Sequence, residues 1–231
     1  MKPIAPSLLV LSGEKRKMAN RVLIWGASGH AKVVLEILHL SRQHEIAGLI
    51  DDVHPERRGE VFSNSPVLGG AEELENALKN GVTMIIIAFG NNAARMAAAS
   101  LAETKGFQLV RAIHPSSIIA ADVSIGYGTV VAAGAVINPA TTIGKNVIVN
   151  TLAGIDHDCV VQDGAHVGPG SRIAGGVTIG RGSWIGIGAT VIDGRQIGQN
   201  SIVGAGAVVV KDIPDGVVAV GVPAKVIRKI V

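Results

Sequence analysis

The chain has 231 residues, of which 48% are hydrophobic and only 3% aromatic, and its formal net charge at pH 7 is +3. This length suits two modest domains with aliphatic cores. The basic residues are scattered and lack interleaved aromatics, which argues against a nucleic-acid partner. No apolar run approaches the ~20 residues of a membrane span. The single cysteine excludes an internal disulfide and fits a reducing compartment, so we expect a cytoplasmic protein.

The first 20 residues precede the first predicted strand. They carry a short apolar stretch that is followed, not preceded, by the basic residues Lys15–Lys17. This order is the reverse of a secretion signal. We expect residues 1–20 to form a disordered leader, with Met18 as an alternative start of the natural chain.

Residues 21–110 alternate strand and helix patterns. A buried-strand run, Arg21–Trp25, leads directly into Gly26-Ala-Ser-Gly29-His30 and then a helical pattern through Leu40. A strand, a glycine turn and a helix begin a βαβ unit, whose helix amino terminus can receive an anion. The next strand, Glu45–Ile50, ends in Asp51-Asp52, where acidic side chains can meet a ribose or base.

The same alternation continues toward the middle of the chain. We expect a helix over residues 71–79, a strand over Thr83–Phe89 and a helix from the Gly90-Asn91-Asn92 cap to about Thr104. Such alternation predicts a parallel sheet that binds its ligand at the carboxyl ends of the strands. The unit is short for a dinucleotide, so we expect a nucleotide-linked ligand. The candidate residues at these ends are Gly26, Ser28, Gly29, His30, Asp51, Asp52 and Gly90.

The second half has a repeat of six. An Ile or Val falls on every sixth residue from Ile113 to Val209. A small or short side chain follows four positions later nearly every time, and Arg195 and Ile213 are the clear exceptions. This period fits neither an amphipathic helix nor a single strand. It is typical of a β-helix, in which each hexad forms one short flat face and its aliphatic residue fills the interior. Cys159 lies on the small-residue positions, which predicts a packing role.

Two histidines lie well inside the repeat. His157 is flanked by Asp156 and Asp158, and a neighbouring carboxylate can fix the imidazole tautomer and raise its basicity. Since three hexads close one coil, residues 18 apart stack, and His157 should lie beside Gly175. His166 lies half a coil away, over ~10 Å from His157 at ~3.3 Å per residue. If both serve one site, they come from different subunits, as in a closed cyclic assembly.

These motifs together resemble one family. Gly26–His30 after the first strand, Asp51-Asp52 after the second, the hexads, Asp156–Cys159 and the terminal Gly221–Lys225 are similar to the bacterial sugar O- and N-acyltransferases of the sialic acid O-acetyltransferase type. That family includes enzymes acting on UDP-4-amino sugars and GDP-perosamine. The resemblance covers roughly residues 21–229.

The resemblance implies an architecture. It implies an α/β, Rossmann-like nucleotide-sugar-binding domain over residues 21–110, followed by a left-handed parallel β-helix over 111–214 and a C-terminal tail over 215–231. It also implies a homotrimer that binds acetyl-CoA in the groove between adjacent coils, without a metal.

The resemblance also implies roles for individual residues. His157 corresponds to the general base, and Asp158, where some relatives have Glu, strengthens that base. His166 corresponds to a contact of the acetyl-CoA thioester, and Gly175, Ile187 and Ala205 to the CoA groove. Ile187 and Ala205 are 18 residues apart, so the repeat by itself places them on one edge. The sheet residues named above correspond to the nucleotide-sugar site.

The expected function is therefore acetyl transfer from acetyl-CoA to the amino group of a nucleotide-linked amino sugar, in polysaccharide or glycan biosynthesis. The alternative within acyl transfer is a sugar hydroxyl, as in sialic acid. A zinc carbonic anhydrase on the same coil would need three converging imidazoles, whereas His114 lies more than two coils from His157. A non-catalytic nucleotide-sugar sensor is a further alternative. The nucleotide, the sugar and the pathway stay open.

Overall fold

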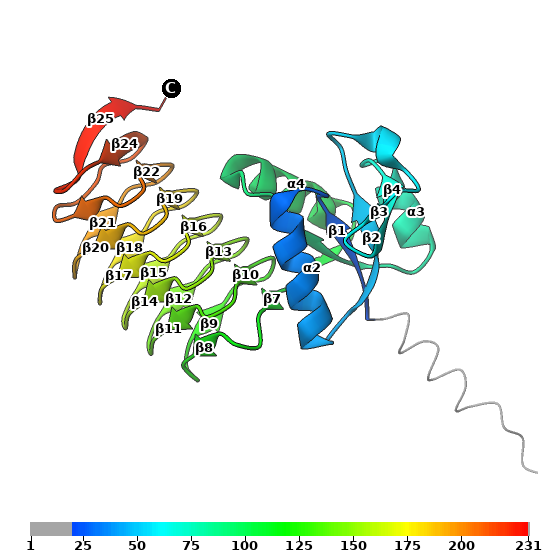
Figure 1. Ribbon diagram of the computed structural model, residues 1–231, viewed down its shortest axis with the longest axis horizontal. Helices are drawn as coiled ribbons and strands as arrows, with labels where there is room; N and C mark the ends of the chain where they lie inside the picture. The colour runs from blue at the N-terminus through cyan, green and yellow to red at the C-terminus, as the bar shows by residue number, and fades with distance from the viewer. Residues whose placement is uncertain (1–19, 231) are drawn as a thin grey trace, which may run out of the picture.

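The computed structural model describes residues 20–230, which form an α/β half and a prism of stacked coils (Figure 1). Nearly all of the predicted leader, residues 1–20, lies outside the described residues. The α/β half ends near Leu109, and the first strand of the prism begins at Ala112.

The α/β half is built on a six-stranded sheet in the order β3-β4-β2-β1-β5-β6. All neighbouring strands are parallel except β3 and β4. The elements are β1 (Arg21–Trp25), α2 (Gly29–Ser41), β2 (Glu45–Ile50), η1 (Pro55–Arg57), β3 (Val61–Phe62), β4 (Ser65–Gly69), α3 (Glu73–Lys79), β5 (Met84–Ile87), α4 (Asn92–Thr104) and β6 (Gln108–Leu109).

The predicted order of strands and helices in this half is confirmed, and three short strands are added to it. The β3–β4 hairpin and β6 did not emerge from the sequence pattern. β4 reads Ser-Pro-Val-Leu-Gly, in which Pro66 and Gly69 break the apolar run, and β6 has only two residues. Their strand character comes from pairing with β2 and β5, which the local sequence does not encode.

Helices cover both faces of the sheet. α3 and α4 pack on one face, and α2 lies on the other, between the sheet and the coils (Figure 1). The apolar stripe of α2 is buried because the helix contacts both: its side chains share one hydrophobic cluster with the sheet and with Ala112, Val130 and Ile148 of the prism. The two halves therefore share a continuous core.

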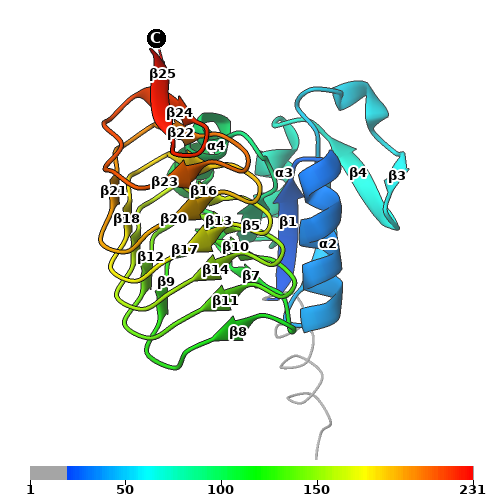
Figure 2. The same ribbon diagram turned by 60° about the vertical axis from the view of Figure 1, so that its left-hand side comes forward.

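The prism has three faces of two-residue strands, and residues 18 apart pair in parallel from coil to coil, as for Val131 and Val149 (Figure 2). The first face holds β7 (Ala112–Ile113), β10 (Val130–Val131), β13 (Ile148–Val149), β16 (His166–Val167), β19 (Trp184–Ile185), β22 (Ile202–Val203), β24 (Val217–Val220) and β25 (Lys225–Lys229). The second face holds β8 (Ile118–Ile119), β11 (Val136–Ile137), β14 (Gly154–Ile155), β17 (Arg172–Ile173), β20 (Thr190–Val191) and β23 (Val208–Val209). The third face holds β9 (Ser124–Ile125), β12 (Thr142–Ile143), β15 (Val160–Val161), β18 (Thr178–Ile179) and β21 (Gln196–Ile197).

The aliphatic residue of each central hexad points into the prism. From Val131 to Val209 these side chains are at most 3% exposed, and small residues such as Cys159 and Ala165 are fully buried beside them. The predicted fold class, a parallel-sheet domain followed by a β-helix, is confirmed. Residues 215–231, expected as a tail, contribute two strands: β24 continues the first face and β25 pairs with it antiparallel.

Among residues 20–230, no helix has the length and apolar character needed to cross a bilayer.

Candidate active site

The corners of the prism separate the predicted site residues. We name the corners by the faces they join. The first corner (first to second face) carries Ile187 and Ala205, and the second corner (second to third face) carries His157, Asp158 and Gly175. The third corner, between the third and first faces, is the one that contacts α4 of the sheet domain. One protomer therefore cannot bring His157 next to Ile187.

His157 occupies the exposed turn of the second corner. Its Nδ1 lies 2.7 Å from Oδ2 of Asp158, whose backbone takes a left-handed conformation (φ 57°) at this turn. Asp156 accepts a hydrogen bond from the His157 backbone N–H through Oδ1. The hydrogen bond to Asp158 and the negative charge of Asp156 raise the pKa of His157 above its ordinary value. The arrangement fixes the tautomer and directs Nε2 away from the carboxylate as a proton acceptor.

Gly175 lies directly under this imidazole. A Cβ atom built on Gly175 would sit 2.7 Å from Cε1 of His157, closer than side chains tolerate. The predicted stacking of residues 18 apart is thus confirmed at this pair. Because φ of Gly175 is outside the left-handed region, glycine is needed here for the space it leaves to the ring.

His166 lies in a different environment, on the first face of the prism. Its ring is buried, stacks on Trp184 with 5.8 Å between centroids, and places Nε2 3.0 Å from the Asn150 amide nitrogen. The ring also faces the backbone of Gly90, which acts to raise its pKa. Burial first, then the nearby Arg95 and His30, lowers the pKa of His166 to about 3. This imidazole is therefore neutral, and its Nε2 is engaged by the Asn150 amide.

The carboxyl edge of the sheet offers an open helix terminus. Ser28, the N-cap of α2, makes no side-chain capping bond, and the first turn of α2 has no acidic residue. Gly26 has φ 127°, and a Cβ there would lie 3.0 Å from the Ala88 carbonyl. Such a glycine turn before a helix amino terminus suits an anion. Burial, assisted by the charge of Arg95, lowers the pKa of the adjacent His30 to about 4.

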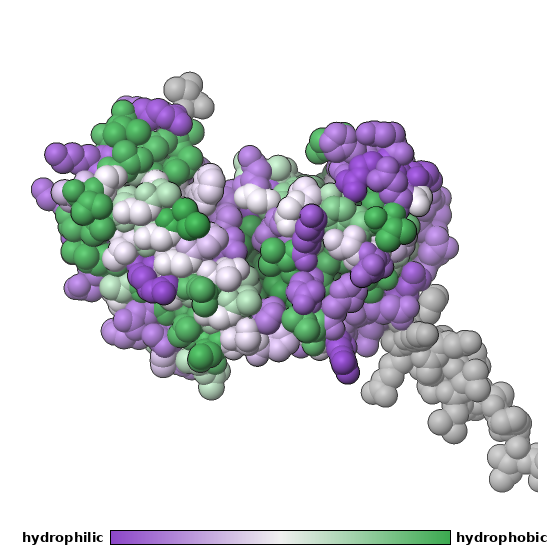
Figure 3. All heavy atoms as spheres, in the orientation of Figure 1, coloured by the Kyte–Doolittle hydropathy of each residue, from purple (hydrophilic) through white to green (hydrophobic). Residues whose placement is uncertain are grey.

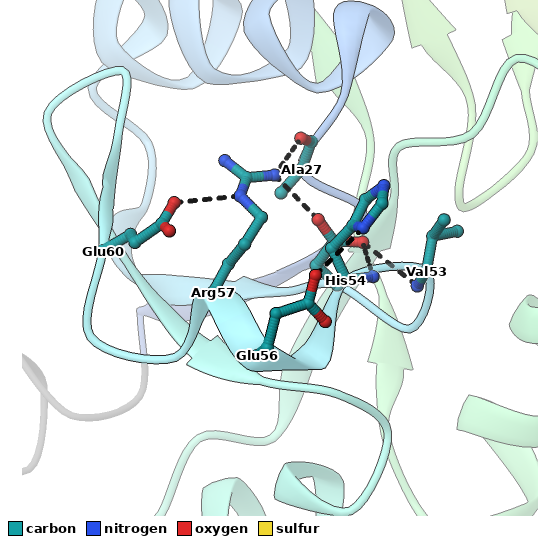
Figure 4. Close-up of polar contacts among 7 residues, drawn as sticks. Ala27, Val53, His54, Glu56, Arg57 and Glu60 are labelled. Carbon is teal, nitrogen blue, oxygen red and sulfur yellow. Dashed lines mark hydrogen bonds and ion pairs between the residues drawn. The ribbon is translucent and has the colours of Figure 1, made fainter.

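The two aspartates after β2 have different surroundings. Figure 4 shows the loop that follows them, in which Arg57 contacts Ala27 and Glu60. Asp51 is buried; its Oδ1 accepts the backbone N–H groups of Val53 and His54, and its Oδ2 pairs with Arg57 at 2.8 Å. Arg57 also donates to the carbonyl of Ala27 in the glycine turn. Asp51 thus ties residues 51–57 to that turn.

Asp52 is the more accessible of the two aspartates. Its Oδ2 accepts a hydrogen bond of 2.8 Å from the indole N–H of Trp25, and the residue is exposed. Of the acidic pair, Asp52 therefore has the carboxylate that a ligand at the strand ends can reach.

The structure adds residues that sequence reasoning missed. Arg95 is fully buried in α4, and Asn150 and Trp184 hold His166. A signal existed for Arg95, because it is spaced with Ala98, Ala99 and Ala102 on the buried stripe of the helix. Nothing in the hexad pattern distinguishes Asn150 from other outward residues.

One hollow adjoins the His157 turn, and a larger one lies away from the predicted site residues. A groove of about 290 Å³ on the second face adjoins the His157 turn and is lined by Asn138, Asp156, Arg172 and Thr190 among others. A larger cavity of about 770 Å³ lies at the opposite edge of the sheet, beside Gln43, Arg111 and Tyr127, and no predicted site residue lines it. Within residues 20–230, no three His, Cys, Asp or Glu side chains gather as metal ligands.

Substituting Gly175→Ala tests the contact with His157. The new methyl group must push the ring aside, which weakens the Asp158 hydrogen bond, so we expect the pKa of His157 to fall toward its ordinary value. Side-chain NMR titration measures it. Gly154→Ala is the matched control, because its Cβ would meet only the Arg172 side chain at 3.5 Å. An unaltered His157 titration in Gly175→Ala would contradict this account.

Two protein-family models match the chain. Residues 21–101 match the PglD N-terminal domain, and residues 176–211 match the bacterial transferase hexapeptide (six repeats). A curated relative, UDP-N-acetylbacillosamine N-acetyltransferase of Bacillus subtilis (strain 168), is 36% identical over 116 residues. That match spans 48% of this chain and only half the length of the relative.

Solved structures match over most of the chain. PerB from Caulobacter crescentus, in complex with CoA and GDP-perosamine, is 41% identical with a TM-score of 0.84, and the match covers 89% of this chain and 96% of PerB. The acetyltransferase domain of PglB from Neisseria gonorrhoeae FA1090, in complex with acetyl coenzyme A, is 37% identical with a TM-score of 0.84, covering 90% and 99%. With these similarities, the chain belongs to the hexapeptide-repeat family of sugar acyltransferases.

Proposed function

We propose that this protein is an acetyl-CoA-dependent N-acetyltransferase that acts on the amino group of a nucleotide-linked amino sugar. The observation that carries the proposal is the His157–Asp158 pair, a carboxylate-supported base exposed at a corner of the prism. The relatives add the substrate class, since PerB binds CoA with GDP-perosamine and the PglB domain binds acetyl coenzyme A.

The chemistry is a direct transfer. Nε2 of His157 takes a proton from the substrate amine as its nitrogen attacks the thioester carbonyl. The N–C bond forms, the C–S bond breaks, and the imidazolium returns its proton to the CoA thiolate. Asp158 stabilises the imidazolium through the bond to Nδ1. General-base assistance of this kind contributes roughly 10²–10⁴-fold.

The sheet domain, residues 21–110, binds the nucleotide part of the acceptor in this proposal. The phosphates lie at the amino terminus of α2, near Gly26, Ser28, Gly29 and His30, where backbone N–H groups and the helix dipole favour negative charge. Asp52 contacts the ribose or base, and Asp51 acts through the loop that it anchors. Gly90 borders the site on the next strand of the sheet.

The acetyl-CoA groove lies between protomers of a cytoplasmic homotrimer in this proposal. Within one chain His157 and Gly175 are on the second corner and Ile187 and Ala205 on the first, so a complete groove needs the first corner of a neighbouring prism. The prism carries apolar side chains at its surface (Figure 3), among them Ile118, Leu152 and Ile187, each more than half exposed in the single chain. Threefold packing covers such residues. His166 faces the thioester end of the cofactor.

An acceptor panel tests the proposed function. Purified protein is incubated with acetyl-CoA and UDP-, GDP- or dTDP-linked 4-amino sugars, or with free sialic acid, and CoA release is followed by thiol detection. We expect turnover with at least one nucleotide-linked amino sugar. Acetylation of sialic acid alone would favour the hydroxyl alternative, and absence of acetyl-CoA binding would favour a sensor.

The role of His157 is tested by His157→Ala. Because His157 is an exposed turn residue, we expect the variant to fold and to bind acetyl-CoA normally. Its kcat should fall by at least about 10²-fold, because the general base is lost. Steady-state kinetics on the best acceptor measures this. His39→Ala, at the exposed end of α2, is the matched control and should retain full activity. Wild-type turnover by His157→Ala would remove the general base from the mechanism.

The pH profile tests the pairing with Asp158. A base must be neutral, so the rate rises with pH through the pKa of His157, which Asp158 and Asp156 hold above its ordinary value. In Asp158→Asn the largest contribution to that raised pKa is lost, and the inflection of kcat against pH should move to lower pH. The maximal rate should also fall, because the imidazolium loses its partner. An inflection that stays in place would show that a group other than His157 titrates.

A further inference from the structure

A buried guanidinium joins the two halves of the molecule. Arg95 is 0% exposed, and all its hydrogen-bond partners among the described residues are neutral oxygens, none of them a carboxylate. The acceptors are the carbonyls of Asn146 (2.9 Å), Phe89 (3.1 Å), Gly90 (3.3 Å), Gly164 (2.9 Å) and Ala165 (3.4 Å) and the side-chain oxygen of Asn92 (2.9 Å).

These acceptors come from both sides of the junction. Phe89 and Gly90 form the loop between β5 and α4 at the substrate-binding edge of the sheet, whereas Asn146 and Gly164 are turn residues of two successive coils at the third corner. The neighbouring Asn92 reaches the next coil through the carbonyl of Gly182, at 2.9 Å. A planar fork with five donors suits such a spread of carbonyls, and an ammonium does not.

The same guanidinium lies beside the contact that joins substrate edge and prism. The His166 ring faces the backbone of Gly90, and Arg95 donates to both Gly90 and Ala165, the residue before His166. Arg95 therefore holds both partners of the His166–Gly90 contact.

Burying Arg95 at this position carries a desolvation cost. Its position continues an otherwise apolar stripe with Ala98, Ala99 and Ala102, where an aliphatic residue would pack without desolvating a charge. Burial lowers the pKa of Arg95 to about 10, so it is still a cation at neutral pH. A buried charge whose acceptors are all neutral oxygens fixes geometry, since these acceptors must come together in one arrangement.

We propose that Arg95 is a positioning residue, which locks the Phe89–Gly90 loop of the sheet onto the coil that carries His166 and so sets the distance between the bound nucleotide sugar and the acetyl-transfer site. This inference rests on the proposed function for its kinetic consequence only. Arg95 touches the loop and the coils; apart from His166, the residues of the proposed acetyl-CoA groove lie on the first and second corners, which Arg95 does not contact.

The two substrates should therefore respond differently to its loss. In Arg95→Met the fork is replaced by an unbranched apolar chain, and Gly90 is free to move from His166. We expect kcat/KM for the nucleotide sugar to fall by about 10²-fold, as for a misplacement on the order of 1 Å, with a higher KM. The dissociation constant of acetyl-CoA should change far less, because His166 is the one proposed groove residue beside Arg95. Arg111→Met, at the opposite edge of the junction where Arg111 stacks on Tyr127, is the matched control and should behave as wild type.

A residue that only stabilises the fold gives another pattern. It would lower the active fraction, and kcat with it, and leave both binding constants unchanged, or it would weaken both equally; either result overturns the proposal. If Arg95→Met does not fold, Arg95→Lys is used instead, because it keeps an aliphatic side chain and the positive charge but lacks the planar guanidinium. The same split between the two substrates, smaller in size, is expected.

A spectroscopic measurement separates failure of this inference from failure of the proposed function. The titratable or charged groups facing His166 are Arg95 from α4 and His30 from α2. With no substrate present, the His166 side-chain NMR resonances should move in both variants, because the Gly90 backbone shifts away from the ring. In Arg95→Met the pKa of His166 should also rise, because the charge of Arg95, which lowers it, is gone; Arg95→Lys keeps the charge and should show no such rise. His166 resonances unchanged in both variants would overturn the proposal even if the wild type acetylates an amino sugar. If they move and no amino sugar is acetylated, only the proposed function fails.

Discussion

The structure depends on one constraint: each aliphatic residue of the hexads must stack on the one 18 residues away. Val131, Val149 and Val167 pair in this way, and the register cannot slip without expelling an interior side chain. Every outward residue then has a fixed corner and level. The position of an exposed turn residue such as His157 is therefore set by the packing of the core beneath it.

The same side chain has two opposite states on this scaffold. His157 projects into solvent between two carboxylates, which raises its pKa, whereas His166 is buried near two basic groups, which lowers its pKa to about 3. One imidazole can therefore take up and release a proton at the surface, and the other stays neutral and contacts Asn150. The two histidines differ in pKa because their surroundings differ.

The fold was predictable wherever its cause is local or periodic. The hexads, β1, α2, β2 and α4 follow from sequence patterns, and so does the His157–Asp158 pair, because its partners are adjacent in the chain. Strand β4 could not be predicted in this way, because its strand character comes from pairing with β2. The hydrogen bonds of Arg95 could not be predicted for the same reason. Acceptors such as the carbonyls of Asn146 and Gly164 are far away in sequence, and every residue type has a backbone carbonyl. The different surroundings of Asp51 and Asp52 arise likewise from Arg57 and Trp25.

The C-terminal hairpin has a consequence for end-to-end stacking of the coils. A stack of parallel coils ends in a strand with unpaired backbone groups, which is a template for fibre growth. Here β25 turns back on β24 in the opposite direction, and its exposed side chains include Lys225, Arg228 and Lys229. An incoming strand would have to desolvate that positive charge. The charged strand β25 thus hinders a further strand from adding to this end of the first face.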